Sequence, residues 1–382
     1  MIYCDYAATT PMLDEAMDIY SEINRSYFGN ASSLHDFGTK ANDYLRHARE
    51  LIAHCFRAKS ENIIFTNGGT EGNILAINTL LRSIPTKDKP HVISTMMEHS
   101  SIYYHLLSLE KENQIDVTFL EGNKEGHITI EQVIHAIKPS TKLVTIQYVN
   151  GETGVKQPIE EISALLSKKN ILFHSDFVQS FGKIHTDVTQ LPIDAITVSS
   201  HKIYGPKSVG AIYFRNPHVL VHHPIETNHE FGLRPGTVDV AAICAFAVSA
   251  KRIHEIAVYE HLYQVRAYFI NQLKQKEIPL LPLCSKNSCP SIVGCISNEI
   301  QGDYLLLEYN RFNIAISTGS ACALGQQEIP RAVLPLLDNE EDGKRYIRFS
   351  FSHLTTFEEI DTIIMVSAKI FQRLEEARLA YG

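Results

Sequence analysis

The sequence predicts an α/β fold, in which helices cover both faces of a mostly parallel sheet, followed by a smaller α+β domain. Strand-like apolar runs and helical segments alternate from about residue 62 to 215, with short loops between them. Strand-like pieces and helices alternate again in the C-terminal part. Because 382 residues are many for one hydrophobic core, two domains are expected.

The N-terminal part begins with an extended arm at residues 2–13, and a helix is predicted at residues 14–23. A loop rich in Gly, Asn and Ser follows at residues 27–38. Residues 39–57 have the apolar spacing of an amphipathic helix, with Ala41, Leu45, Ala48, Ile52 and Cys55 on one face. This apolar face predicts packing in the hydrophobic core, and no functional site is expected on it.

Two strand-to-helix turns in the predicted sheet carry candidate ligand-binding residues. Residues 62–81 combine a buried strand, a Gly-Gly turn and a helix, which makes Gly69 and Thr70 candidates for binding a phosphate. Alone this signal is weak, because such turns are also common as plain connections. Residues 91–107 repeat the layout and place His99 at the C-terminal end of a strand, where open α/β sheets bind ligands.

Two further strands end in polar residues. The strand at 142–149 leads into Asn150, and the segment 171–182 carries Asp176 and Gln179. An Asp at a strand end often only caps a helix. The alternative is a carboxylate beside a pyridine nitrogen, which keeps that nitrogen protonated.

The polar loop between the predicted strands 195–199 and 209–214 carries His201 and Lys202. A loop lysine is usually solvated. The alternative is an amine that bonds to the aldehyde of a cofactor, its pKa lowered by partial burial or by cationic neighbours. Lys202 would lie at the same sheet edge as the other strand-end residues, which are Thr70, His99 and Asp176.

The C-terminal part holds two more candidates. Residues 317–330 are small and polar, and nothing bulky flanks Cys322, so its thiol is either an incidental loop thiol or an accessible nucleophile. In the predicted strand 345–351, Arg348 alternates with apolar residues and would face inward, where it needs an anionic partner.

Composition disfavours several classes of protein. The formal charge of −8 argues against direct nucleic-acid binding. No apolar run is long enough to cross a bilayer, and the first residues lack a basic region followed by an apolar one, so a cytoplasmic location is expected. The seven cysteines include no C-x-x-C pair, which disfavours a disulfide framework or a zinc site, and no metal is expected.

The segment Ser-Ser-His-Lys-x-x-Gly-Pro-Lys at 199–207 resembles the pyridoxal-phosphate lysine segment of cysteine desulfurases, in the class V aminotransferase group. Two further segments resemble that family: Asp-Tyr-Ala-Ala-Thr-Thr at 5–10 and Ser-x-Gly-Ser-Ala-Cys at 317–322. The resemblance spans nearly the whole chain and implies a fold-type-I, pyridoxal 5′-phosphate-dependent transferase with a seven-stranded sheet.

The resemblance also implies a domain division. Residues 15–250 would form the large cofactor-binding domain. Residues 1–14 and 251–382 would form the small domain, which carries the mobile loop of the catalytic cysteine.

The resemblance further implies residue roles. Lys202, Cys322 and His99 would be catalytic, with His99 stacked on the cofactor ring. Thr237 would reach across a homodimer interface to the partner's cofactor. The implied cofactor-binding residues are Gly69, Thr70, His99, Asp176, Gln179, Ser199, His201, Lys202 and Thr237. The implied substrate-binding residues are Arg348, Asn30 and Asn150.

Four positions depart from the family pattern. They are Gly151, where Asn is usual, Phe177 for Ala, Ser208 for Gly and Phe231 for Arg.

The sequence therefore predicts an L-cysteine desulfurase that forms L-alanine and a persulfide on Cys322. The sulfur would pass to an acceptor protein, with tRNA thiolation favoured over iron–sulfur cluster assembly. One alternative keeps the cofactor but changes the reaction, giving a selenocysteine lyase, a sulfinate-releasing lyase or an aminotransferase. Another is a non-catalytic subunit, to which the four departures give some weight.

Overall fold

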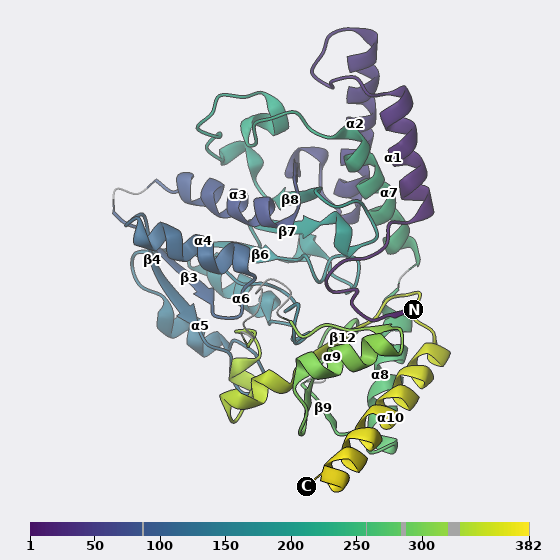
Figure 1. The fold of residues 1–382 in the computed structure, drawn as a ribbon. Helices are drawn as coiled ribbons and strands as arrows, with labels where there is room; N and C mark the ends of the chain where they lie inside the picture. Colours follow the sequence, from purple (N-terminus) through teal and green to yellow (C-terminus); the bar gives the residue numbers. More distant parts are fainter. Residues whose placement is uncertain (86–87, 257, 284–287, 320–328, 382) are drawn as a thin grey trace.

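The computed structural model describes residues 1–382 except 86–87, 257, 284–287, 320–328 and 382 (Figure 1). Its largest sheet has seven strands in the order β2-β8-β7-β6-β5-β3-β4. The strands are β2 (Ile63–Thr66), β3 (His91–Thr95), β4 (Asp116–Leu120), β5 (Thr141–Thr145), β6 (Leu172–Asp176), β7 (Ala195–Ser199) and β8 (Gly210–Phe214). Pairing is parallel from β4 to β7, whereas β8 is antiparallel to β7 and β2. The predicted mostly parallel sheet is confirmed.

Helices cover both faces of this sheet, because successive side chains of a strand point to opposite faces. Ile64 packs in one apolar cluster with residues of α3 and α4, and Ile63 packs in another with residues of α2, α6 and α7. The large-sheet helices are α1 (Asp14–Ser26), α2 (Asp36–Cys55), α3 (Gly69–Arg82), α4 (Ser100–Lys111), α5 (Ile130–Ala136), α6 (Ile159–Lys168) and α7 (Val240–Ile256).

A second group of elements surrounds an antiparallel sheet of order β12-β10-β9 (Figure 1). Its strands and helices are α8 (Tyr259–Gln275), β9 (Leu280–Pro282), β10 (Ile292–Ser297), α9 (Gly302–Arg311), β12 (Tyr346–Ser350) and α10 (Phe357–Tyr381).

The N-terminal arm packs with this second group. β1 (Ile2–Tyr3) pairs in parallel with β11 (Ile314–Ala315), and the buried Cys4 belongs to the apolar cluster of β10 and β12. Ala250 instead packs in the cluster beneath the large sheet. The division into 15–250 and the rest stays a prediction, and these packing groups follow it closely. Within the described ranges, no helix is long and apolar enough to span a membrane.

Candidate active site

The carboxyl ends of the large-sheet strands face a cavity of about 640 Å³, which the N-terminal arm and β12 also line. The structure brings most of the predicted site residues to its wall. These are Gly69, Thr70, His99, Asn150, Asp176, Gln179, Ser199, His201, Lys202 and Arg348.

Three predicted residues are not placed at this cavity. Asn30 is exposed, and its Oδ1 accepts a hydrogen bond from the Ser32 amide (2.9 Å) within its own loop. Asn30 does not line the cavity, and its predicted substrate contact stays a prediction. Thr237 is also exposed and does not line the cavity, and its predicted role in a second copy's site stays a prediction. Cys322 lies outside the residues that the structure describes.

The amine of Lys202 is held inside the cavity. Its Nζ donates to the carbonyl oxygens of Ala7 (2.6 Å) and Ala8 (2.7 Å) in the N-terminal arm. Burial, followed by the charges of Lys183 and Arg348, lowers the pKa of Lys202 to about 7. A large share of this amine is therefore unprotonated and nucleophilic near neutral pH.

The turn before α3 is suited to an anion. Gly68 has φ +112°, a conformation that residues with a side chain rarely adopt. As the N-cap residue it offers no side-chain acceptor to the first N–H groups of α3. A Cβ atom on Gly69 would lie 2.9 Å from Val178 Cγ2 and 3.5 Å from Ser199 Cβ, so only glycine leaves this space open. Free N–H groups at the N-terminus of a helix favour a phosphate here.

Asp176 and His99 belong to one hydrogen-bond network. Asp176 is buried at the end of β6, and its two oxygens accept from the Val178 amide and from Asn73 Nδ2, both at 2.8 Å. Asn73 Nδ2 also donates to Ser101 Oγ (3.0 Å), which lies 2.8 Å from His99 Nδ1. The network therefore fixes the position of the Asp176 carboxylate relative to the His99 imidazole.

The tautomer of His99 follows from its position before α4. Because Nδ1 accepts from the Ser101 amide (3.2 Å), the neutral ring carries its proton on Nε2. Burial lowers the pKa of His99, while the Asp176 carboxylate opposes this shift. His99 can thus exchange a proton through Nε2.

Sequence reasoning missed several polar residues of this site. Asn73 precedes the apolar run Ile74–Ala76 in α3, which is a weak signal for a polar residue facing the sheet, whereas Glu98 and Gln147 give no such signal. Glu98 accepts from the Gln147 amide and from Thr95 Oγ1, and burial raises its pKa to about 8.

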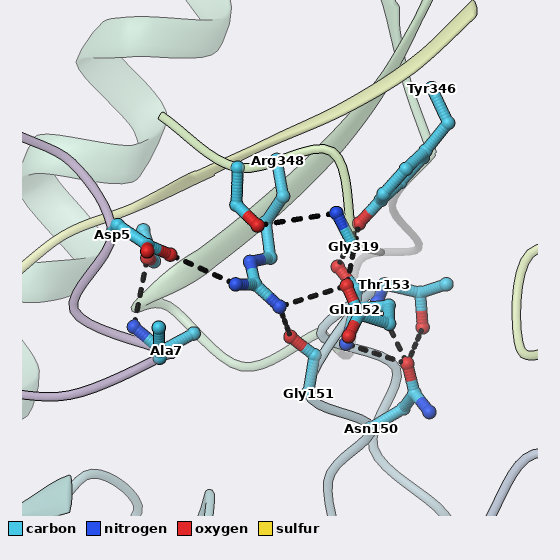
Figure 2. Close-up of polar contacts among 12 residues, drawn as sticks. Asp5, Ala7, Asn150, Gly151, Glu152, Thr153, Gly319, Tyr346 and Arg348 are labelled. Atoms are coloured by element: carbon cyan, nitrogen blue, oxygen red, sulfur yellow. Dashed lines mark hydrogen bonds and ion pairs between the residues drawn. The ribbon is translucent and has the colours of Figure 1, made fainter. Parts of the chain in front are cut away.

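Arg348 lies between two carboxylates (Figure 2). Its Nη1 donates to Glu152 Oε2 (2.8 Å) and to the Gly151 carbonyl (2.9 Å), and its Nη2 donates to Asp5 Oδ1 (2.9 Å). Burial disfavours the guanidinium charge, but Glu152, Tyr346 and Asp5 outweigh it and raise the pKa of Arg348. Its buried Nε has no hydrogen-bond partner among the described residues.

Glu152 also contacts the segment that precedes Cys322. The Tyr346 hydroxyl donates to the Glu152 carbonyl (2.8 Å), as Figure 2 shows. Gly319 has φ +78°, and a Cβ there would lie 2.8 Å from Glu152 Oε2. A side chain at position 319 would therefore disturb the Arg348 cluster, which consists of Asp5, Glu152 and Arg348.

The departure at Gly151 has a visible consequence. The neighbouring Asn150 side chain serves its own turn, because its Oδ1 accepts from the amides of Glu152 (2.9 Å) and Thr153 (2.8 Å). Its Nδ2 donates to the Met97 carbonyl (3.1 Å), which leaves one N–H for a ligand. Asn150 is therefore a weak substitute for a side chain at position 151.

The other departures lie away from the cavity wall. Phe177 packs against Tyr148, with ring centroids 4.9 Å apart, and lines a separate cavity of about 200 Å³. Ser208 is exposed with φ +60°. Phe231 is half-exposed with φ +56°. None of the three lines the large cavity.

Comparison with known proteins agrees with this geometry. The family model described as aminotransferase class-V matches residues 2–363. The chain is 44% identical to a NifS protein of Bacillus subtilis (95% of this chain, 93% of the relative). It is 34% identical to the human cysteine desulfurase (98% and 82%).

Solved structures show the same relationship. A NifS-like protein superposes with a TM-score of 0.89 and 25% identity, covering 97% of this chain and 99% of that chain. SspA in complex with cysteine superposes with a TM-score of 0.80 and 30% identity, covering 93% and 100%. The chain therefore belongs to the class-V aminotransferase family of pyridoxal phosphate-dependent enzymes, in its group of NifS- and IscS-like cysteine desulfurases.

Proposed function

We propose that this protein removes sulfur from L-cysteine, releases L-alanine and holds the sulfur as a persulfide on Cys322. One observation carries the proposal. A nucleophilic amine (Lys202), a buried carboxylate (Asp176) and a buried guanidinium (Arg348) converge on one cavity. The relatives named as cysteine desulfurases support the choice of substrate.

The residues of the cavity fit pyridoxal phosphate. The N-terminus of α3 would hold the phosphate, with Thr70 and Ser199 beside it, and Asp176 would face the ring nitrogen. When bound, the cofactor supplies an aldehyde and an electron-poor ring that stabilises negative charge on the substrate. Lys202 is the amine within reach of that aldehyde.

Arg348 would bind the α-carboxylate of the substrate. Its buried Nε–H is the donor that no described residue satisfies, so a ligand oxygen there would remove an unsatisfied polar group. Lys202 and His99 Nε2 would then move protons to and from the substrate inside the cavity.

Cys322 would carry the sulfur. Its thiolate attacks the substrate sulfur, the S–S bond forms and the Cβ–S bond breaks. The electron pair of the broken bond stays on carbon, which takes up a proton to give L-alanine. The reaction therefore needs no external oxidant or reductant.

The homodimer, the sulfur acceptor and the cytoplasmic location are further parts of the proposal. Exposed apolar side chains support a dimer, since Phe28, Leu34 and Phe37 are each more than half exposed near the loop of Asn30. A surface of this kind is typical of an interface. For the acceptor, a tRNA-thiolation protein remains favoured over an iron–sulfur scaffold.

The test is to incubate the holoenzyme with L-cysteine and to map by mass spectrometry which thiol gains sulfur. We expect the added sulfur on Cys322 in the wild-type protein, together with alanine in solution. Cys322→Ser should lose both, whereas the matched variant Cys55→Ser should keep both. Normal alanine formation by Cys322→Ser would refute the proposed step.

A further inference from the structure

A second lysine, Lys183, lies behind the active site, and no part of the proposed reaction uses it. Its side chain is buried, with 7% of the residue exposed, although lysine is rarely buried without a charged partner. Its Nζ donates to Gln179 Oε1 (3.1 Å), a neutral acceptor, and it forms no ion pair with any described residue. Such an arrangement is costly for an ammonium group and calls for an explanation.

Lys183 and Lys202 are joined by a short chain of hydrogen bonds. Because Gln179 Oε1 accepts from Lys183, the Nε2 end of the same amide faces the cavity and donates to the Ala7 carbonyl (2.9 Å). The Ala7 carbonyl also accepts from Lys202 Nζ (2.6 Å). A reversed Gln179 amide would direct its NH₂ group at the ammonium and lose both hydrogen bonds.

Gln179 has an open side toward the cavity. Position 151 carries no side chain, and a Cβ there would lie 3.3 Å from Gln179 Nε2. No side chain at position 151 holds the Gln179 amide from the cavity side. The orientation of this amide therefore depends on Lys183 and the N-terminal arm.

The charges around Lys202 give Lys183 a second effect. The groups that face Lys202 are Asp5, Glu152, Arg348, Lys183, His99 and His201. Asp5 and Glu152 favour a protonated Lys202, whereas the Arg348 guanidinium that pairs with both carboxylates disfavours it. His99 and His201 are largely neutral near pH 7, because burial lowers the pKa of both, that of His201 to about 4. Of the two cations that disfavour a proton on Lys202, Lys183 and Arg348, Lys183 has the larger effect.

We propose that Lys183 is a positioning residue of the active site, which orients the Gln179 amide toward the cofactor pocket and disfavours a proton on Lys202. The inference rests on the proposed function for the importance of Lys202, but its two effects belong to the protein without cofactor. Burial lowers the pKa of Lys183 itself to about 8, so its charge is present at neutral pH and below.

The charge effect is tested on the apoenzyme by acylating its amines across a pH series and quantifying the Lys202 peptide by mass spectrometry. We expect Lys183→Met to move the labelling profile of Lys202 upward by roughly one pH unit. At a pH below the pKa of Lys202, a shift of this size makes the acylation of Lys202 about tenfold slower. Lys183→Arg should restore the wild-type profile, and Lys168→Met, which removes an exposed lysine on α6, should leave it unchanged.

The orientation effect is tested by the affinity of the apoenzyme for pyridoxal phosphate. Lys183→Gln keeps a hydrogen-bond donor for Gln179 without the charge, so it should shift the labelling profile yet bind the cofactor more tightly than Lys183→Met. Equal affinity of these two variants would refute the orientation role. An unchanged labelling profile in Lys183→Gln or Lys183→Met, with native thermal unfolding, would refute the charge role. The labelling profile and the cofactor affinity are both measured without cysteine turnover. A negative result in either one is therefore distinguishable from a failure of the proposed function.

Discussion

The two sides of the large cavity are assembled in different ways. On the cofactor side, two contacts are local, since Asp176 accepts from the amide of Val178 and His99 accepts from that of Ser101, although Lys202 also reaches Ala7, 195 positions away. On the Arg348 side, the contacts are remote, since Arg348 is separated from Asp5 by 343 positions and from Glu152 by 196. The local contacts of the cofactor side arise where a strand ends and a helix begins. The Arg348 side depends on charge pairing among three segments that only the tertiary fold brings together.

The largest effect is expected on the cofactor side, from Lys202→Ala. Loss of the amine should reduce alanine formation from L-cysteine by roughly 10⁴-fold, the upper end of what a single proton-transfer group contributes. The protein should still fold, because the hydrogen bonds of the Lys202 amine to described residues go to two carbonyl groups of the arm. Lys168→Ala serves as the control and should retain full activity. Substantial turnover by Lys202→Ala would show that this side does not hold the reactive group.

On the Arg348 side, Arg348→Met should remove the proposed contact with the substrate carboxylate and should also lower stability. It leaves the carboxylates of Asp5 and Glu152 without their partner, and breaking a buried ion pair in this way costs about 3–5 kcal/mol. Urea unfolding measures the loss. The triple variant Arg348→Met, Asp5→Asn, Glu152→Gln removes the unpaired charges and should recover most of the stability. A single variant as stable as the wild type would mean that the long-range cluster does not support the fold.

A smaller effect, again on the cofactor side, concerns pH. The pKa of Lys202 is lowered to about 7, so the unprotonated amine is present above this pH and is lost as pH falls below it. Uptake of pyridoxal phosphate by the apoenzyme should therefore slow by about tenfold per pH unit below 7. Absorbance of the bound cofactor after rapid mixing measures the rate. An uptake rate that is still rising steeply above pH 9 would mean that the amine has an ordinary pKa.

The smallest effect is expected outside the cavity, from Ser208→Gly. Ser208 has φ +60°, which costs a residue with a side chain about 1–2 kcal/mol relative to glycine. The extra backbone freedom of glycine in the unfolded chain offsets about 0.5–1 kcal/mol. A net gain of about 0.5–1 kcal/mol in the free energy of unfolding should appear in urea titrations, with activity unchanged. A loss of stability would indicate that the serine makes a favourable contact.

The sequence by itself determined the α/β alternation of a mostly parallel sheet and the placement of His99, Asp176 and Lys202 at strand ends. These features depend on periodicity of two or of about 3.6 residues and on local turn chemistry, which a linear chain displays directly. It also singled out Arg348, because an arginine in an apolar strand stands out.

The tertiary structure alone decided which charges meet. The pairing of Arg348 with Asp5 and Glu152 and the burial of Lys183 leave no mark in the linear order of residues, although Lys183 and Gln179 are only four positions apart. The reason is physical. Charge interactions depend on distance in space and on removal from water, and both are fixed only when the arm, the sheet and β12 pack together.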